Sequence, residues 1–184
     1  MPRWRYIFLY SGGLFFELAS LIVILVVIGV LINYFLFSIT PIKGASMEPN
    51  FFSGDWTLIN KSSYIKNSPK RGDVVGLRFP GDPNSEKYIK RVIGLPKEQL
   101  IISGGKIFIN SVELKEGYLP KDTFTIPDLS VQLHEDQYFL IGDNRNNSSD
   151  SRIWGPASKK EFIGRVIFVI FPFKNYQYIS QPSY

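Results

Sequence analysis

The hydrophobic residues of this chain follow two different patterns, which divide it into two parts. Residues 18–37 form a run of twenty residues without a charged side chain, interrupted only by Ser20, Gly29 and Asn33. At about 1.5 Å per residue, a helix of this length crosses the roughly 30 Å hydrocarbon core of a bilayer. From about residue 40 onward, apolar and polar residues alternate in short segments, which is typical of β-strands.

The second part of the chain carries strand-like segments separated by turn residues. Asn110-Ser111, between two apolar segments, is a two-residue hairpin signal. No segment beyond residue 40 has apolar residues at helical spacing. We expect a polar loop over 115–136 and a loosely ordered tail from Lys174. The sequence predicts a mainly β fold: a single N-terminal transmembrane helix followed by a coiled antiparallel β-sheet domain. The predicted strands are 56–59, 73–79, 88–93, 107–109, 112–114, 137–141 and 162–171.

The charges around the apolar run predict its orientation. Arg3, Arg5 and the amino terminus precede the run, and only Lys43 follows it closely. Because positive residues stay on the cytoplasmic side, the N-terminus is expected in the cytoplasm and the β-domain outside. The expected organisation is a cytoplasmic segment 1–17, a transmembrane signal-anchor helix 18–38 and an extracytoplasmic domain 39–184.

A cleaved signal peptide is the alternative interpretation of the apolar run. The run is longer than the apolar region of a typical signal peptide, which has about 7 to 15 residues. Residues 35–37 are bulky, so no small-residue cleavage site follows directly. Residues 11–13 are Ser-Gly-Gly and are expected to separate the short apolar segment 7–10 from the run. The sequence therefore favours one uncleaved span.

The composition excludes several kinds of site. The chain has no cysteine, which excludes disulfides, thiolate zinc sites and cysteine nucleophiles. Its one histidine, His134, lies in a polar stretch and is expected on the surface, which argues against a zinc site built on several histidines. The net charge of +5 is spread along the chain without a basic stripe, so the lipid bilayer rather than nucleic acid is the expected partner.

Ser46 and Lys90 are the candidate catalytic residues. Gly44 and Ala45 precede the serine, and their small side chains would let an extended peptide approach while backbone N–H groups face an oxyanion. The alternative for Ser46 is an ordinary turn serine. Alternation over 88–93 places Lys90 and Arg91 on opposite faces, so one of these two charges is expected to point inward.

A buried lysine would suit a serine nucleophile as its base. Desolvation lowers a lysine pKa by roughly 3 to 5 units, which makes the neutral amine available near neutral pH. Ser-Lys pairs are a known variant of the catalytic triad. The alternative for Lys90 is a lysine that reaches the rim of the domain with its charge in water. If the pair is catalytic, Ser46 Oγ and Lys90 Nζ should lie about 2.6–3.2 Å apart.

A loop of alternating charges follows the 137–141 strand. It contains Asp143, Arg145, Asp150 and Arg152 among several Asn and Ser residues, and it is either a solvated turn or a rigid hydrogen-bonded loop. In the second case Ser148 would orient the lysine as a neutral acceptor, because a carboxylate in that place would raise the lysine pKa. The two aspartates are expected to pair with Arg145 and Arg152.

Taken together, these segments resemble the type I (leader) signal peptidases of peptidase family S26, which are Ser-Lys proteases. Five segments occur in the order that is typical of that family, and together they cover most of the chain. They are the apolar run, Gly44-Ala45-Ser46-Met47-Glu48-Pro49, Arg71-Gly72-Asp73-Val74-Val75, residues 88–96 and residues 142–152.

The resemblance implies a membrane-bound serine endopeptidase that removes N-terminal signal peptides from exported preproteins at the plasma membrane, with no metal and no other cofactor. Ser46 would be the nucleophile, Lys90 the general base and Ser148 the residue that positions the lysine. Substrates would carry small residues at positions −1 and −3, held in shallow pockets. The implied pocket residues are Ile42, Met47, Phe51, Tyr88 and Ile89, and the implied structural polar loop contains Asp143, Arg145, Asp150 and Arg152.

The chain also departs from the family pattern. Gly44 stands where some members carry a serine hydroxyl for the oxyanion hole, so the hole would use the Ser46 N–H and the backbone at Gly44. Asn146 stands where an aspartate is frequent, which puts the charge pairing of that loop in doubt. The region between Lys97 and Asp136 is short, so a compact member without a large second β-domain is expected.

Three other classes of protein compete with this interpretation. The endoplasmic-reticulum branch of the family has histidine at the lysine position, whereas position 90 is lysine. Penicillin-interacting enzymes carry Ser-x-x-Lys, which occurs at Ser63/Lys66 and Ser103/Lys106, but the accompanying Lys-Thr-Gly and Ser-x-Asn motifs are missing. The third is a membrane-anchored β-domain that binds exported partners without catalysis.

Overall fold

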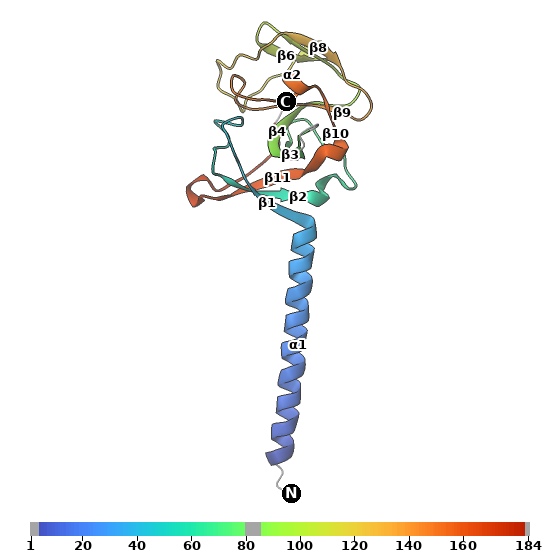
Figure 1. The fold of residues 1–184 in the computed structure, drawn as a ribbon, viewed down its shortest axis with the longest axis vertical. Coiled ribbons are helices and arrows are strands. Elements are labelled where there is room, and N and C mark those ends of the chain that lie inside the picture. The colour runs from blue at the N-terminus through green and yellow to red at the C-terminus, as the bar shows by residue number, and fades with distance from the viewer. Residues whose placement is uncertain (1–3, 80–85, 183–184) are drawn as a thin grey trace. The chain divides into compact units, whose positions relative to one another are not determined.

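A computed structural model describes residues 4–79 and 86–182 of the chain, with side chains from residue 15 onward. The chain divides into two compact units, Met1–Leu36 and Phe37–Tyr184. The first unit contains one long helix and the second contains the β-strands (Figure 1). The mainly β fold with one N-terminal helix agrees with the prediction.

The helix α1 spans Trp4–Leu36, and its Phe15–Leu36 part has a mean hydropathy of 2.9. Within the described residues it is the one helix long and apolar enough to cross a membrane. The expected break at residues 11–13 is wrong, because the helix runs through them; a glycine in a helix costs only about 1 kcal/mol. Arg3 and the side chain of Arg5, on which the predicted orientation depends, lie outside the described part.

The helix ends two residues before the expected boundary at residue 38. Phe37 and Ser38 already belong to strand β1, Phe37–Pro41, which pairs with β2, Trp56–Asn60. The β-branched residues Ile39 and Thr40 follow at once, and such side chains favour a pleated strand over a helix.

The main sheet has eight antiparallel strands. Its order is β1-β2-β11-β3-β4-β9-β10, and β12 pairs with β11 beside this path. Strand β2 and part of β11 show the predicted alternation, but β3, β4 and β9 are buried along nearly their whole length because elements pack on both of their faces. The remaining strands are β3 Val74–Arg78, β4 Lys87–Gly94, β9 Gln137–Ile141, β10 Ala157–Ser158, β11 Phe162–Phe171 and β12 Gln177–Tyr178.

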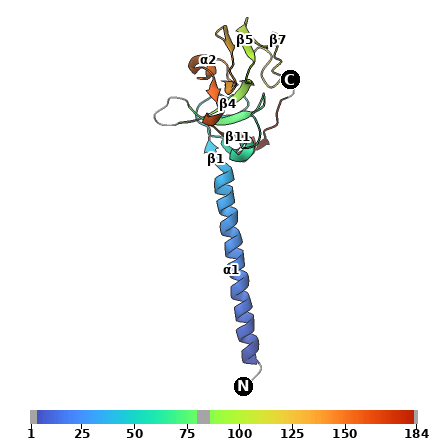
Figure 2. The same cartoon turned by 90° about the vertical axis from the view of Figure 1, so that its right-hand side faces the viewer.

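A second, four-stranded sheet lies at the end of the domain away from β1 and β2 (Figures 1 and 2). Its order is β7-β6-β5-β8, so the region 97–136 forms a small sheet of its own. The polar loop expected over 115–136 is therefore interrupted by a strand, β8, whose Leu129 and Val131 pack on the core of this sheet. The strands are β5 Gln99–Ser103, β6 Lys106–Ile109, β7 Val112–Glu113 and β8 Leu129–Gln132.

Short helical turns connect the strands. They are the α-helical turn α2, Ser151–Trp154, and the 3-10 turns η1 Lys61–Tyr64, η2 Lys159–Glu161 and η3 Phe173–Asn175. Asp150 directly precedes α2, and its side chain caps the helix by accepting a hydrogen bond from the Arg152 N–H.

The C-terminal segment is ordered, contrary to the expectation of a loose tail from Lys174. The Ile179 side chain is buried in the same apolar cluster as Met47 and Phe51, and its N–H donates to Ile167 O at 2.9 Å. A single apolar residue in a polar tail carries no periodic signal, which is why the sequence pattern did not predict this contact.

We predict that Ile179→Ala destabilises the domain by about 2–4 kcal/mol, because it opens a cavity in the apolar cluster. The exposed neighbour Ser180→Ala serves as the matched control and should change the free energy of unfolding by less than about 0.5 kcal/mol. Urea unfolding of both variants in detergent, followed by tryptophan fluorescence, measures the difference. Equal stability of the two variants would contradict the packing of this segment.

Candidate active site

Ser46 lies on a tight turn between β1 and β2. The turn is closed by hydrogen bonds from the Glu48 N–H to Ala45 O at 3.2 Å and from the Phe51 N–H to Met47 O at 3.0 Å. Met47 and Phe51 are each only 1% exposed and pack into the core of the main sheet. The apolar side chains on either side of the turn thus fix the backbone that carries the serine.

Lys90 approaches this serine from strand β4. Its Nζ donates a hydrogen bond to Ser46 Oγ at 2.7 Å, within the distance expected for a catalytic pair. The lysine is 1% exposed, and its only approach to an aromatic ring among the described residues is to Tyr88, on the same face of the strand. One charge of the Lys90-Arg91 pair was expected to point inward, and the burial of Lys90 excludes the alternative of a lysine that reaches the rim.

Burial lowers the pKa of Lys90 from its ordinary value of 10.5 to about 8. The carboxylates of Asp150 and Asp143 act in the opposite direction, and the Arg152 guanidinium adds to the lowering. The amine is therefore neutral in an appreciable fraction of molecules at a pH only slightly above neutrality. A neutral amine that touches a serine hydroxyl is able to accept its proton.

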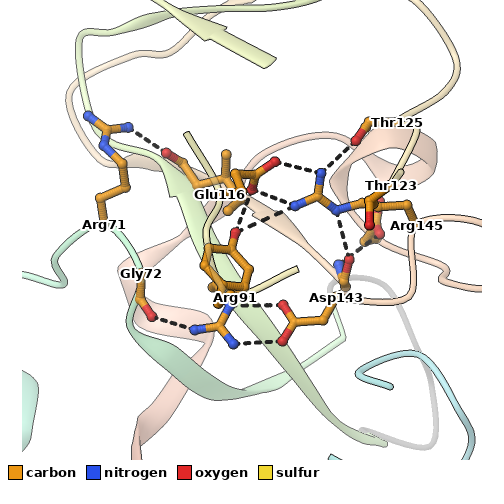
Figure 3. Close-up of polar contacts among 12 residues, drawn as sticks. Arg71, Gly72, Arg91, Glu116, Thr123, Thr125, Asp143 and Arg145 are labelled. Carbon is orange, nitrogen blue, oxygen red and sulfur yellow. Dashed lines mark hydrogen bonds and ion pairs between the residues drawn. The ribbon is translucent and has the colours of Figure 1, made fainter. Parts of the chain in front are cut away.

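Arg91 is also buried, at 4% exposed, although only one charge of the Lys90-Arg91 pair was expected to point inward. Its guanidinium forms two hydrogen bonds with the carboxylate of Asp143, at 2.8 and 2.6 Å, and a third with Gly72 O (Figure 3). The Tyr118 ring covers the same guanidinium at 4.1 Å. The buried guanidinium of Arg91 is thus compensated by an ion pair, whereas the buried amine of Lys90 has a lowered pKa instead.

The ion pairs of the polar loop differ in part from the prediction. Asp150 pairs with Arg152 as expected, with its carboxylate 2.8 Å from the guanidinium Nε. Asp143 pairs with Arg91 instead of an arginine of its own loop, and Arg145 pairs with Glu116 (Figure 3). The expected pairing failed because Arg91 and Glu116 come from distant segments that only the fold brings to the loop.

These ion pairs reduce the influence of the carboxylates on Lys90. Burial by itself would raise the pKa of the Asp150 carboxyl, but hydrogen bonds from Arg152 and from the Gly142 N–H hold this pKa below its ordinary value. The negative charge of Asp150 is thus compensated by the guanidinium of Arg152. No carboxylate in the described part of the chain forms an ion pair with Lys90.

Ser148 and Gly44 occupy positions that differ from their expected roles. Ser148 Oγ is buried and forms no hydrogen bond of normal geometry within the described residues, so it does not bind Lys90 in this structure. The Gly44 N–H donates to Ser53 Oγ at 3.2 Å and is therefore engaged, and this glycine has a φ of 83°. The roles predicted for these two residues stay predictions.

Ser46 lines a cleft of about 330 Å³. One wall is formed by β1 and the residues after it, and the other by the start of β4. Four of the five predicted pocket residues line it, namely Ile42, Met47, Tyr88 and Ile89. Phe51 does not line the cleft, because its ring points into the core beneath the turn. Elsewhere in the described residues, no group of three or more His, Asp or Glu side chains is placed to hold a metal ion.

Comparison with known proteins identifies the family. The model of the family "Signal peptidase, peptidase S26" matches residues 15–171. The chain belongs to this family. A signal peptidase I of Bacillus amyloliquefaciens is 36% identical over 165 residues, which cover 84% of this chain and 87% of the relative. Signal peptidase I P of Bacillus subtilis subsp. natto is 35% identical over 169 residues, which cover 86% and 90%.

A crystal structure of a signal peptidase I from Enterococcus faecalis is also similar, with 28% identity and a TM-score of 0.48. It covers 54% of this chain and 97% of the crystallised one. As a member of family S26, the protein is a peptidase, and the resemblance inferred from the five sequence segments is confirmed.

Sequence reasoning missed three residues that hold the site together. Asn144 donates to the backbone on both sides of the serine, Asn50 donates to the carboxylate of Asp143 at 2.9 Å, and Glu116 binds Arg145. Asn144 belongs to the segment 142–152, which the sequence singled out, but the sequence did not indicate what its side chain contacts. Asn50 and Glu116 gave no sequence signal, because their partners are distant along the chain.

We predict that Lys90→Met stabilises the protein at pH 7 while removing the candidate base. Lowering a pKa from 10.5 to about 8 means that the unfolded state binds more protons than the folded state between these values. Stability therefore rises as the pH rises from about 8 to 10.5, and the full penalty of about 3 kcal/mol is present below pH 8. Methionine fills a similar volume without a charge, so a gain of about 1–3 kcal/mol is expected.

Urea unfolding at pH 7 and pH 10.5 measures this gain, which should shrink at the higher pH. Lys115→Met, at an exposed lysine, is the matched control and should leave the stability nearly unchanged. A Lys90→Met protein less stable than the wild type at pH 7 would show that the buried amine is not destabilising.

Proposed function

We propose that this peptidase is a membrane-bound signal peptidase that cleaves N-terminal signal peptides from exported preproteins with a Ser46-Lys90 dyad. The observation that carries the proposal is the 2.7 Å hydrogen bond between a buried lysine amine and the hydroxyl of a serine that lines a cleft. Relatives that are named signal peptidase I and align with most of the chain support the substrate class.

The reaction uses the two side chains in two steps. The neutral Lys90 amine takes the proton of Ser46 as Oγ forms a bond to the scissile carbonyl carbon. The C–N bond then breaks, and the amine of the mature protein leaves with the proton from Lys90. In the second step, water loses a proton to Lys90 and attacks the ester carbon. The C–Oγ bond then breaks as Lys90 returns the proton to Ser46 Oγ, and the signal peptide leaves as a carboxylic acid.

The walls of the cleft suit an extended peptide. Among the described strands, β1 pairs only with β2, so its other edge is available for a substrate strand that lies between β1 and β4. Ile42, Met47 and Ile89 form the floor, and each is at most 8% exposed. Because this floor is shallow, side chains that point into it must be small, which supports the preference for small residues at positions −1 and −3.

The apolar helix supports anchoring in the plasma membrane. Phe15–Leu36 is long enough for a single span, and the basic residues near the N-terminus favour a cytoplasmic N-terminus with residues 39–184 outside. In the proposed organisation, the cytoplasmic segment ends at residue 17, as the sequence predicted, and the transmembrane helix ends at Leu36 instead of residue 38.

We expect Ser46→Ala and Lys90→Met each to lower kcat/KM for a preprotein in detergent by at least about 10³-fold, because each removes one member of the dyad. The matched controls are Ser130→Ala and Lys115→Met, at exposed positions in the second part of the domain, which should keep the wild-type rate. Gel analysis of the processed product measures the rates.

Full activity in either dyad variant would overturn the assignment. The alternative, an anchored β-domain that binds exported partners without catalysis, would show preprotein binding in the wild type but no cleavage. Cleavage by the wild type that is lost in both variants would exclude that alternative.

The pH profile should report the lysine base. Since burial lowers the pKa of Lys90 to about 8, the neutral base is lost as the pH falls through this value, and kcat/KM should drop about tenfold per pH unit below it. Above pH 8 the rate should level off. A flat profile between pH 5 and 9 would contradict a lysine base at position 90.

The absence of native cysteines allows a direct test of the membrane topology. We expect Lys121→Cys, at an exposed position of the domain, to react with a membrane-impermeant maleimide in intact cells. Pro2→Cys, near the N-terminus, should react only after the cells are lysed. The opposite pattern of labelling would show that the orientation is reversed.

A further inference from the structure

Asn144 contacts the backbone of the serine turn at two points. Its side-chain Nδ2 donates to Ala45 O at 3.0 Å, and its own N–H donates to Ser46 O at 3.0 Å. Both carbonyls next to the nucleophile therefore point toward the polar loop. The Ala45 carbonyl also accepts from the Glu48 N–H at 3.2 Å, so the side chain of Asn144 adds a second donor to a turn that is partly fixed already.

These contacts determine where the Ser46 N–H points. In a planar trans peptide, the C=O of one residue and the N–H of the next point in opposite directions. Since the Ala45 carbonyl points at Asn144, the Ser46 N–H points away from it. This N–H has no hydrogen-bond partner among the residues that the structure describes. Ser46 lines the cleft, whereas no residue of the loop 142–152 does, so the N–H is directed away from the loop and remains available.

We propose that Asn144 is a positioning residue that holds the Ser46 N–H as the oxyanion donor of the reaction. The proposal rests on the proposed function of Ser46 as the nucleophile. When Oγ adds to the scissile carbonyl, the electron pair of the C=O π bond moves to oxygen, and a fixed N–H stabilises the resulting negative charge. The Gly44 N–H is already bonded to Ser53 Oγ, which makes the orientation of the Ser46 N–H more important.

The loop that carries Asn144 is held firmly from behind. Asp143 forms an ion pair with Arg91 (Figure 3). Its carboxylate accepts a further hydrogen bond from Asn50. Gly142, two residues before Asn144, also lies against the serine turn. A Cβ at this position would lie 2.4 Å from Ser46 O and 2.2 Å from Ser148 Oγ, so only glycine fits. The glycine thus lets the loop backbone lie directly against the serine carbonyl, and the ion pair fixes the position of the loop along the strand.

We expect Asn144→Ala to lower kcat by about 10- to 100-fold with little change in KM, because the donor is not removed but loses part of its fixed orientation. Asn144→Asp keeps the size of the side chain but replaces a donor by a carboxylate, so its loss should be at least as large. Asn146→Ala, at an exposed asparagine of the same loop, is the matched control and should behave as the wild type. The pH midpoint near 8 should be the same in Asn144→Ala and Asn146→Ala, since Lys90 is unchanged, whereas the added carboxylate of Asn144→Asp should move it to higher pH.

A peptide aldehyde separates an oxyanion effect from a general distortion of the site. Ser46 Oγ adds to the aldehyde carbon to form a hemiacetal, in which the former carbonyl oxygen occupies the position of the oxyanion and the serine proton passes to Lys90. The matching peptide alcohol binds in the same cleft without this bond. Asn144→Ala should weaken aldehyde binding by a factor similar to the loss in kcat and leave alcohol binding unchanged.

Each outcome of this experiment decides one question. Equal weakening of aldehyde and alcohol binding would overturn the proposal, because it would show that Asn144 only shapes the cleft. Wild-type kcat in Asn144→Ala would also overturn it. Failure of the proposed function would look different, since Ser46→Ala would then keep its activity whatever the result at position 144.

Discussion

The site depends on one buried amine that forms no ion pair with the residues that the structure describes. Lys90 is 1% exposed, and its Nζ bonds to a serine hydroxyl rather than to a carboxylate. Desolvation penalises the charged form of such an amine, whereas an ion pair would favour it and remove its capacity to accept a proton. The fold has to keep two buried aspartates nearby without letting either one become the partner of the lysine.

Neighbouring residues of one strand resolve this conflict. Lys90 and Arg91 point to opposite faces of β4, so the amine meets the serine turn while the guanidinium takes the carboxylate of Asp143. Asp150 is neutralised in the same way by Arg152. A substitution that removes one member of either ion pair would leave the other member buried and unpaired, which costs free energy in a protein interior. Burial is the main cause of the low pKa of Lys90, and the ion pairs keep both carboxylates engaged with arginines instead of with the lysine.

Much of this arrangement could be predicted from the sequence, and the remainder has a physical reason. The apolar run, the period-two strands and the order of the five segments are local signals, and the predicted distance between Ser46 and Lys90 agrees with the 2.7 Å in the structure. The partners of Asp143 and Arg145 were predicted wrongly, because Arg91 and Glu116 are distant in sequence and charge alternation only indicates near neighbours. The burial of Ile179 was missed for a different reason, because a single apolar residue in a polar tail carries no periodic signal.

Strand register links these features into one unit. Because successive side chains point to opposite faces, a shift of β4 by one residue in one direction would put Lys90 in the place of Arg91, beside Asp143. The amine would then gain a carboxylate and its pKa would rise. A shift in the other direction would put Arg91 in the place of Lys90, and the serine would face a permanent cation. Pairing of β4 with β3 on one side and β9 on the other fixes Arg91 opposite Val74 and Ile141. The backbone ladder of a buried strand thus determines the proton affinity of the lysine that it carries.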